Sequence, residues 1–114
     1  MLTYAVMSFA VAAIIGLIMA ASILRGLLAP WILSLVHAAL GATGLVLVLL
    51  AVFNGSGGLI LIGLVTLLVA ALGGFYLAFL HLQNKVAPSG IVLAHAGLAV
   101  AGFLMLAGTV FNIL

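Results

Sequence analysis

Four long apolar stretches constrain this chain more than any other feature. They run over roughly Leu2–Leu24, Ala29–Phe53, Leu59–Leu82 and Pro88–Ile113. Each exceeds the ~20 residues that an α-helix needs to cross the hydrocarbon core of a bilayer. Strands do not suit them, because a membrane β-strand needs only ~9–11 residues and alternates polar with apolar side chains. The sequence therefore predicts an all-α integral membrane protein with four transmembrane helices.

The charge composition supports this prediction. The chain has 114 residues, 70% of them hydrophobic, with two basic side chains, Arg25 and Lys85, and no acidic residue or cysteine. A soluble domain carries about a quarter charged residues. A soluble globule is therefore excluded, as are nucleic-acid binding through a basic face and sites built on carboxylates or thiolates. Because short loops make neighbouring helices antiparallel, we expect one membrane domain, residues 1–114, folded as an up-down-up-down four-helix bundle.

The two basic residues predict the orientation of the bundle. Arg25 and Lys85 lie in the first and third loops, which an even number of crossings places on one side of the membrane. The positive-inside bias makes that side cytoplasmic. Both termini and the glycine-rich loop at 54–58 are then outside, in a multi-pass protein of the cell inner (cytoplasmic) membrane. The first stretch lacks a positive n-region and is too long for a signal-peptide h-region, so we expect it to be a retained helix.

An internal repeat relates the two halves of the chain at an offset of 58 residues. The segment Pro30–Asn54 aligns without gaps on Pro88–Asn112, and the rare residue types decide the match. The identical pairs are Pro30/Pro88, Leu35/Leu93, His37/His95, Ala38/Ala96, Leu40/Leu98, Gly44/Gly102, Val52/Val110, Phe53/Phe111 and Asn54/Asn112. We therefore expect two duplicated helical hairpins, residues 1–56 and 57–114. Such a parallel repeat has a pseudo-twofold axis along the membrane normal.

The repeat places two histidines in matching positions. His37 and His95 each follow their proline by seven residues, on helices that are parallel and diagonally opposite in such a bundle. Both imidazoles are then at one depth, ~10 Å from the cytoplasmic end at 1.5 Å rise per residue. Ionisable side chains inside a bilayer are costly and are functional candidates. A membrane histidine can also simply hydrogen-bond a neighbouring helix, but a symmetric pair could hold one planar ligand from both faces.

Haem b suits such a pair, because neutral imidazole is a good ligand of haem iron and bundle cores commonly hold cofactors. Small residues provide room for the macrocycle, although each such stripe taken alone is an ordinary packing motif. They are Gly41 and Gly44 after His37, Ala99 and Gly102 after His95, and Gly16 and Gly74 on the other two helices. The available partners of the propionates at the cytoplasmic rim are Arg25, Lys85, His81 and Trp31. Otherwise we expect His81 to be solvated and Trp31 to be an interfacial anchor.

In the layout of four helices, and in His37 and His95 with the small residues that follow them, the chain resembles small membrane b-type cytochromes. The resemblance implies a four-helix bundle that holds haem b between histidines. Here His37 and His95 would be the metal ligands.

The sequence accordingly predicts a membrane electron-transfer protein that is not an enzyme. With both axial positions filled, the iron would carry single electrons and leave no open site for a substrate. Its donor would be quinol or a neighbouring redox subunit. The alternative is a non-catalytic accessory subunit of a larger respiratory or photosynthetic membrane complex, with histidines that pack or bind a chlorophyll-type pigment. Zinc is disfavoured, because two imidazoles leave a tetrahedral site half empty.

Overall fold

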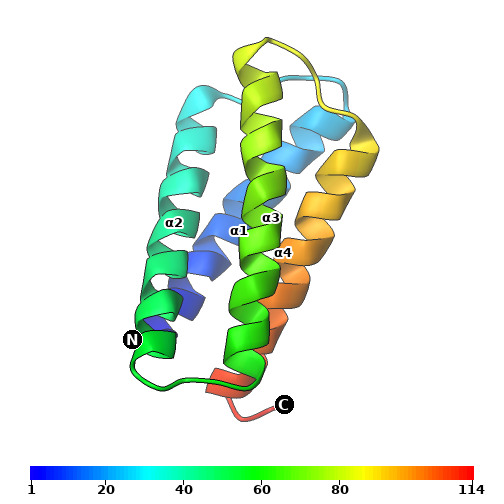
Figure 1. Cartoon of the computed structure of the whole chain (residues 1–114). Coiled ribbons are helices and arrows are strands. Elements are labelled where there is room, and N and C mark those ends of the chain that lie inside the picture. The colour runs from blue at the N-terminus through cyan, green and yellow to red at the C-terminus, as the bar shows by residue number, and fades with distance from the viewer.

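The computed structural model describes residues 1–114 and contains four α-helices and no strand. The helices are α1 (Leu2–Leu24), α2 (Trp31–Phe53), α3 (Leu59–Leu82) and α4 (Ser89–Val110). They run alternately in opposite directions, so both termini and the loop at 54–58 lie at one end of the bundle (Figure 1). The loops that carry Arg25 and Lys85 lie at the other end. The predicted four-helix bundle is confirmed.

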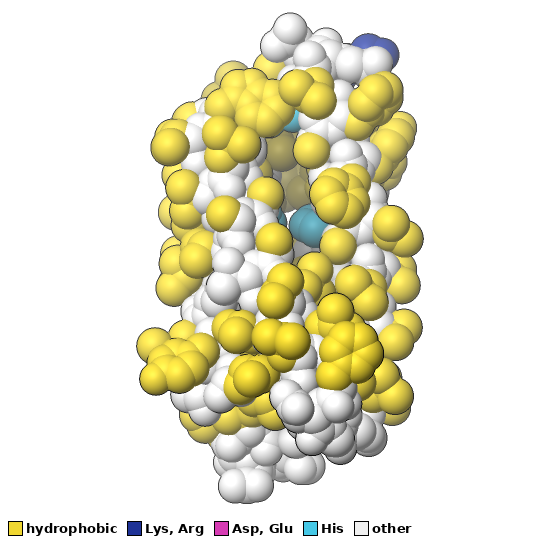
Figure 2. Space-filling view, turned by 60° about the vertical axis from the view of Figure 1, so that its left-hand side comes forward, with side chains coloured by type: hydrophobic (Ala, Val, Ile, Leu, Met, Phe, Trp, Pro, Cys, Tyr) yellow, Lys and Arg dark blue, Asp and Glu magenta, His cyan; other side chains and the backbone are white.

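The helices have the length and surface of membrane spans. The bundle measures 42 × 21 × 19 Å, and the shortest helix has 22 residues. At 1.5 Å per residue this helix is about 33 Å long, enough to cross a hydrocarbon core of about 30 Å. Only 18 of the 114 residues are buried within the chain, and apolar side chains cover the outer face in Figure 2. This surface fits lipid, as expected for a multi-pass membrane protein.

Local chemistry explains where the helices begin and end. Pro30 and Pro88 are N-cap residues with ψ of 139°, so α2 and α4 start one residue after their prolines. This start is slightly later than the apolar stretches predicted. Two residues after the end of each helix, a residue with positive φ adopts the left-handed conformation that terminates helices. These residues are Gly26, Gly55, Asn84 and Asn112. With φ of 57°, Asn112 cannot continue the helix, so α4 stops at Val110 instead of the expected Ile113.

The helices pack closely within each hairpin and less closely between hairpins. α1 packs along α2 and α3 along α4, whereas α1 meets α4 less closely and α2 meets α3 least. α2 and α4 do not pack on each other, and neither do α1 and α3, so both pairs are diagonal. The diagonal placement expected for the helices that carry His37 and His95 is therefore confirmed.

The hydrophobic core fills only one half of the bundle, next to the termini and the loop at 54–58. Its buried members are Ala5, Val6, Phe9, Val48, Ile60, Leu64, Leu67 and Leu106. Toward the opposite end, the buried side chains larger than alanine are Leu80 and Val92. Figure 2 shows this second half hollowed between α2 and α3, with histidine side chains in the opening. The chain thus has a packed half and a half with internal space, which we call the hollow.

Candidate functional site

His37 and His95 lie close together in the hollow half of the bundle. Their ring centroids are 6.2 Å apart and the ring planes are inclined at 74°. Both side chains are half-buried. Because α2 and α4 are diagonal, the two imidazoles reach the middle of the bundle from opposite sides. The structure therefore brings together the two residues that the repeat singles out.

Each imidazole donates a hydrogen bond to a backbone carbonyl of the preceding helix. His37 Nδ1 lies 2.8 Å from the Ala12 oxygen, and His95 Nδ1 lies 2.7 Å from the Ala70 oxygen. A carbonyl only accepts, so Nδ1 carries the proton and the neutral ring presents an unprotonated Nε2. Neither Nε2 atom has a hydrogen-bond partner. Every buried side-chain nitrogen and oxygen in the structure does have one, so both Nε2 atoms must be accessible. The packing hydrogen bonds leave one free lone pair on each ring.

Gly16 and Gly74 make room for these rings. A Cβ added at Gly16 would lie 2.9 Å from Cε1 of His37, and a Cβ added at Gly74 would lie 3.0 Å from Cε1 of His95. Any larger residue would therefore push the imidazole away from its carbonyl partner. Glycine at these two positions therefore leaves the space that the imidazole rings occupy.

The glycines that follow the histidines have two different environments. Gly44 lies under the ring of Phe9 and Gly102 under the side chain of Leu67, and a Cβ at either position would come within 2.6 Å of that neighbour. The structure thus uses these two glycines for packing in the filled half. At Gly41 nothing lies within 4 Å of an added Cβ. Ala99 is half-buried on α4.

His81 is positioned more tightly than expected. Its ring stacks on Trp31 with centroids 3.9 Å apart and planes inclined by 4°. Its Nδ1 lies 3.2 Å from Oγ of Ser34. The expectation of a solvated side chain was wrong, because His81 is half-buried and joins α3 to α2. Sequence reasoning missed this contact, since it joins residues 47 positions apart on helices that pack least closely.

The two basic side chains lie outside the hollow. Arg25 is exposed and its Nε donates to the carbonyl of Ala21, 3.1 Å away in its own helix. Lys85 is exposed in the loop after α3. No acidic side chain exists to pair with either.

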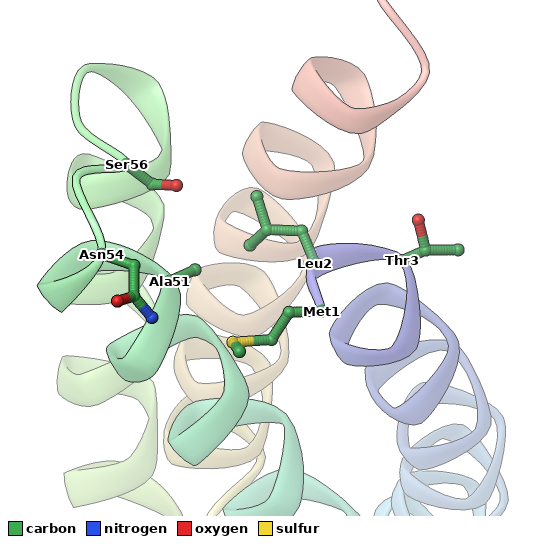
Figure 3. Close-up of a pocket in the computed structure, with 6 residues that line it drawn as sticks. All are labelled: Met1, Leu2, Thr3, Ala51, Asn54 and Ser56. Carbon is green, nitrogen blue, oxygen red and sulfur yellow. The ribbon is translucent and has the colours of Figure 1, made fainter.

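A separate depression lies at the opposite end of the bundle, near the chain termini (Figure 3). It is lined by Met1, Leu2, Thr3, Ala51, Asn54 and Ser56. Its lining includes neither a histidine nor an acidic side chain. The histidine pair is the better candidate for a functional site.

The geometry of the histidine pair bears on whether it could hold a metal ion. The separation of 6.2 Å and the inclination of 74° are those of an edge-to-face contact between the two rings. Two imidazoles bonded to one metal ion at about 2 Å would have a similar centroid separation, roughly 6 Å, once the distance from each nitrogen to its ring centre is included. No group of three histidine, cysteine or carboxylate side chains is present.

Comparison with known proteins assigns no family to the chain. No family model matches it, and neither a curated protein nor a solved structure is similar to it. The function must therefore be argued from the geometry of the histidine pair.

Proposed function

We propose that this chain is a membrane electron-transfer protein that binds one haem b between His37 and His95. One observation carries the proposal: two imidazoles from diagonal helices lie 6.2 Å apart, and each donates Nδ1–H to a carbonyl. A haem-ligating histidine needs this arrangement, with Nε2 free for iron and Nδ1–H bonded to a second partner.

The donor set favours an iron porphyrin over a bare metal ion. Two imidazoles satisfy only half of a tetrahedral zinc site, whereas a porphyrin brings its own four nitrogen ligands and needs only axial ones. The hollow between α2 and α3 leaves space beside the rings (Figure 2), and Gly41 faces no neighbour. The residues present therefore fit the group.

The chain's own residues would set the properties of the site. Hydrogen bonds to the carbonyls of Ala12 and Ala70 fix the tautomers and raise the basicity of the ligating nitrogens. The apolar surroundings exclude water. When bound, haem b supplies one-electron chemistry, and two histidine ligands leave no coordination position open for a substrate. The site is therefore suited to electron transfer and the chain is not an enzyme.

The two halves of the site support the proposed duplication of a helical hairpin. His37 contacts Ala12 and Gly16, and His95 contacts Ala70 and Gly74. Each of these partners is 58 residues from its counterpart, the offset of the sequence repeat. A duplicated hairpin would supply one axial ligand from each copy.

The proposal places the exchange of electrons within the membrane. Apolar side chains cover the outer face of the bundle, so a donor such as quinol or a neighbouring redox subunit would meet it within the bilayer. The positive-inside bias puts the Arg25 and Lys85 loops in the cytoplasm and the termini outside.

Visible spectroscopy of the purified chain tests the proposal. Protein from haem-replete cells should show a Soret band, with sharp α and β bands after dithionite reduction. H37A and H95A should each lose the low-spin spectrum. G97A is the control and should keep it, because Gly97 is exposed and nothing lies within 4 Å of a Cβ added there. A folded but colourless wild-type protein would refute the proposal and favour the accessory subunit, and a chlorophyll-like spectrum would indicate a pigment.

A further inference from the structure

A cluster of Trp31, Ser34 and His81 crosses the gap between α2 and α3. The parallel stack of the Trp31 and His81 rings fixes the plane of the imidazole. Ser34 Oγ, 3.2 Å away, engages Nδ1 of His81. These three residues are the polar bridge between the two helices that otherwise pack least closely.

The cluster lies directly beside the histidine pair. Ser34 precedes His37 by three residues, about one helical turn or 4.5 Å along α2, so the two side chains lie on the same face of the helix. The cluster is therefore between the pair and the end of the bundle that carries Arg25 and Lys85. Figure 2 shows histidine side chains at two levels of the hollow on this face.

The free nitrogen of His81 can donate a hydrogen bond. When the Ser34 hydroxyl donates to Nδ1, the neutral ring carries its proton on Nε2, and a protonated ring carries one there whichever way this bond runs. The Nε2 atom of His81 has no hydrogen-bond partner. Since every buried side-chain nitrogen has one, this Nε2 atom must be accessible. Lys85 follows in the exposed loop after α3 and adds positive charge at this end of the bundle, where no acidic side chain competes. This corner of the hollow is therefore suited to a carboxylate.

The matching corner between α1 and α4 has no such cluster. The positions 58 residues from His81, Trp31 and Ser34 are Ile23, Ser89 and Val92. Val92 is buried there, and α1 and α4 pack more closely than α2 and α3. Only the gap between α2 and α3 therefore offers a polar partner to a ligand in the hollow.

We infer that His81, held by Trp31 and Ser34, binds a propionate of the porphyrin and determines which edge of it faces the Arg25 and Lys85 end. This inference rests on the proposed binding of haem between His37 and His95. The core side chains Phe9 and Leu67, which pack over Gly44 and Gly102, offer no polar group to a propionate. His81 would thus be a specificity-determining residue that does not touch the iron.

Titration of the cofactor-free chain in detergent, with haem b and with haem b dimethyl ester, tests the inference. The ester binds iron in the same way but has no carboxylate. We expect the wild type to bind haem b about 10- to 100-fold more tightly than the ester, the range for a hydrogen bond to a charged group. H81L should lose this preference and leave the affinity for the ester unchanged. S34A should lose part of it, because the ring is less well held.

I23A is the matched control, since it changes the corresponding position on α1, and it should keep the full preference. If H81L weakens both porphyrins equally, or weakens neither, the inference is wrong. If K85Q instead removes the preference, the carboxylate partner is Lys85 and the inference is equally wrong. These outcomes differ from a failure of the proposed function, in which neither porphyrin gives a low-spin spectrum with the wild type.

Discussion

Replacing Gly16 or Gly74 by alanine tests whether the glycines position the imidazoles. A Cβ at Gly16 would lie 2.9 Å from Cε1 of His37, although ordinary contact begins at 3.4 Å. The difference is 3.4 − 2.9 = 0.5 Å, so the ring must retreat by about this amount. Its 2.8 Å bond to the Ala12 carbonyl then lengthens to about 3.3 Å, beyond the usual range of such bonds. Gly74 demands a similar shift of 0.4 Å from His95, because its Cβ would lie 3.0 Å away.

The expected effect follows from these distances. Overpacking of this kind typically lowers stability by about 1–3 kcal/mol. Weakening of the hydrogen bond by the same displacement accounts for about 0.5–1.5 kcal/mol of this cost. We expect G16A and G74A each to lower the free energy of unfolding by about 1–3 kcal/mol. Since both displace an axial ligand, haem affinity should fall about 5- to 150-fold, the equivalent of that free energy.

The assay combines unfolding in detergent micelles with haem titration, both followed by absorbance. G97A is the matched control, because nothing lies within 4 Å of an added Cβ at this exposed helical position. It should be neutral, or stabilising by up to about 1 kcal/mol from helix propensity. If G16A and G74A behave like G97A in both measurements, the glycines do not position the rings and the argument is refuted.

Three further predictions concern packing and topology. Ser8 Oγ donates to the Leu40 carbonyl across α1 and α2 (2.7 Å), whereas Thr66 bonds to Ile62 within its own helix. S8A should therefore cost about 0.6 kcal/mol of unfolding free energy and T66A less; equal losses would contradict this. G44A should destabilise the bundle by about 1–3 kcal/mol through Phe9, and F9L should restore part of the loss; no rescue would mean that Phe9 is not the obstacle. The chain has no cysteine, so a membrane-impermeant maleimide on intact cells should label S56C and spare N84C, and the reverse pattern would invert the orientation.

The helix spans and their arrangement could be predicted from the sequence. Apolar runs have an unambiguous length requirement in a bilayer, and the short loops force antiparallel neighbours. The diagonal placement of α2 and α4 was only assumed for such a bundle, and the helix contacts establish it. The helix ends were less predictable, since Asn112 adopts a left-handed conformation that an apolar run does not reveal.

The details of the site could not be predicted, because the helices are apolar on all sides and no amphipathic stripe fixes their rotation. The sequence repeat predicted that His37 and His95 would lie close together, but it could not show that the Nδ1 atom of each ring would bond to the preceding helix. For the same reason the contacts of Gly44 with Phe9 and of Gly102 with Leu67 could not be predicted. The stack of Trp31 on His81 depends on the relative rotation of α2 and α3.

The most direct test of the central claim is low-temperature electron paramagnetic resonance of the oxidised protein with one equivalent of haem b per chain. His37 and His95 sharing one iron predicts a low-spin ferric signal. Their ring planes, inclined at 74°, further predict the strongly anisotropic form with a large maximal g value that near-perpendicular imidazoles produce. H37A and H95A should each convert this signal to high spin. A high-spin signal from the wild type, or a low-spin signal that survives loss of either histidine, would contradict the shared ligation.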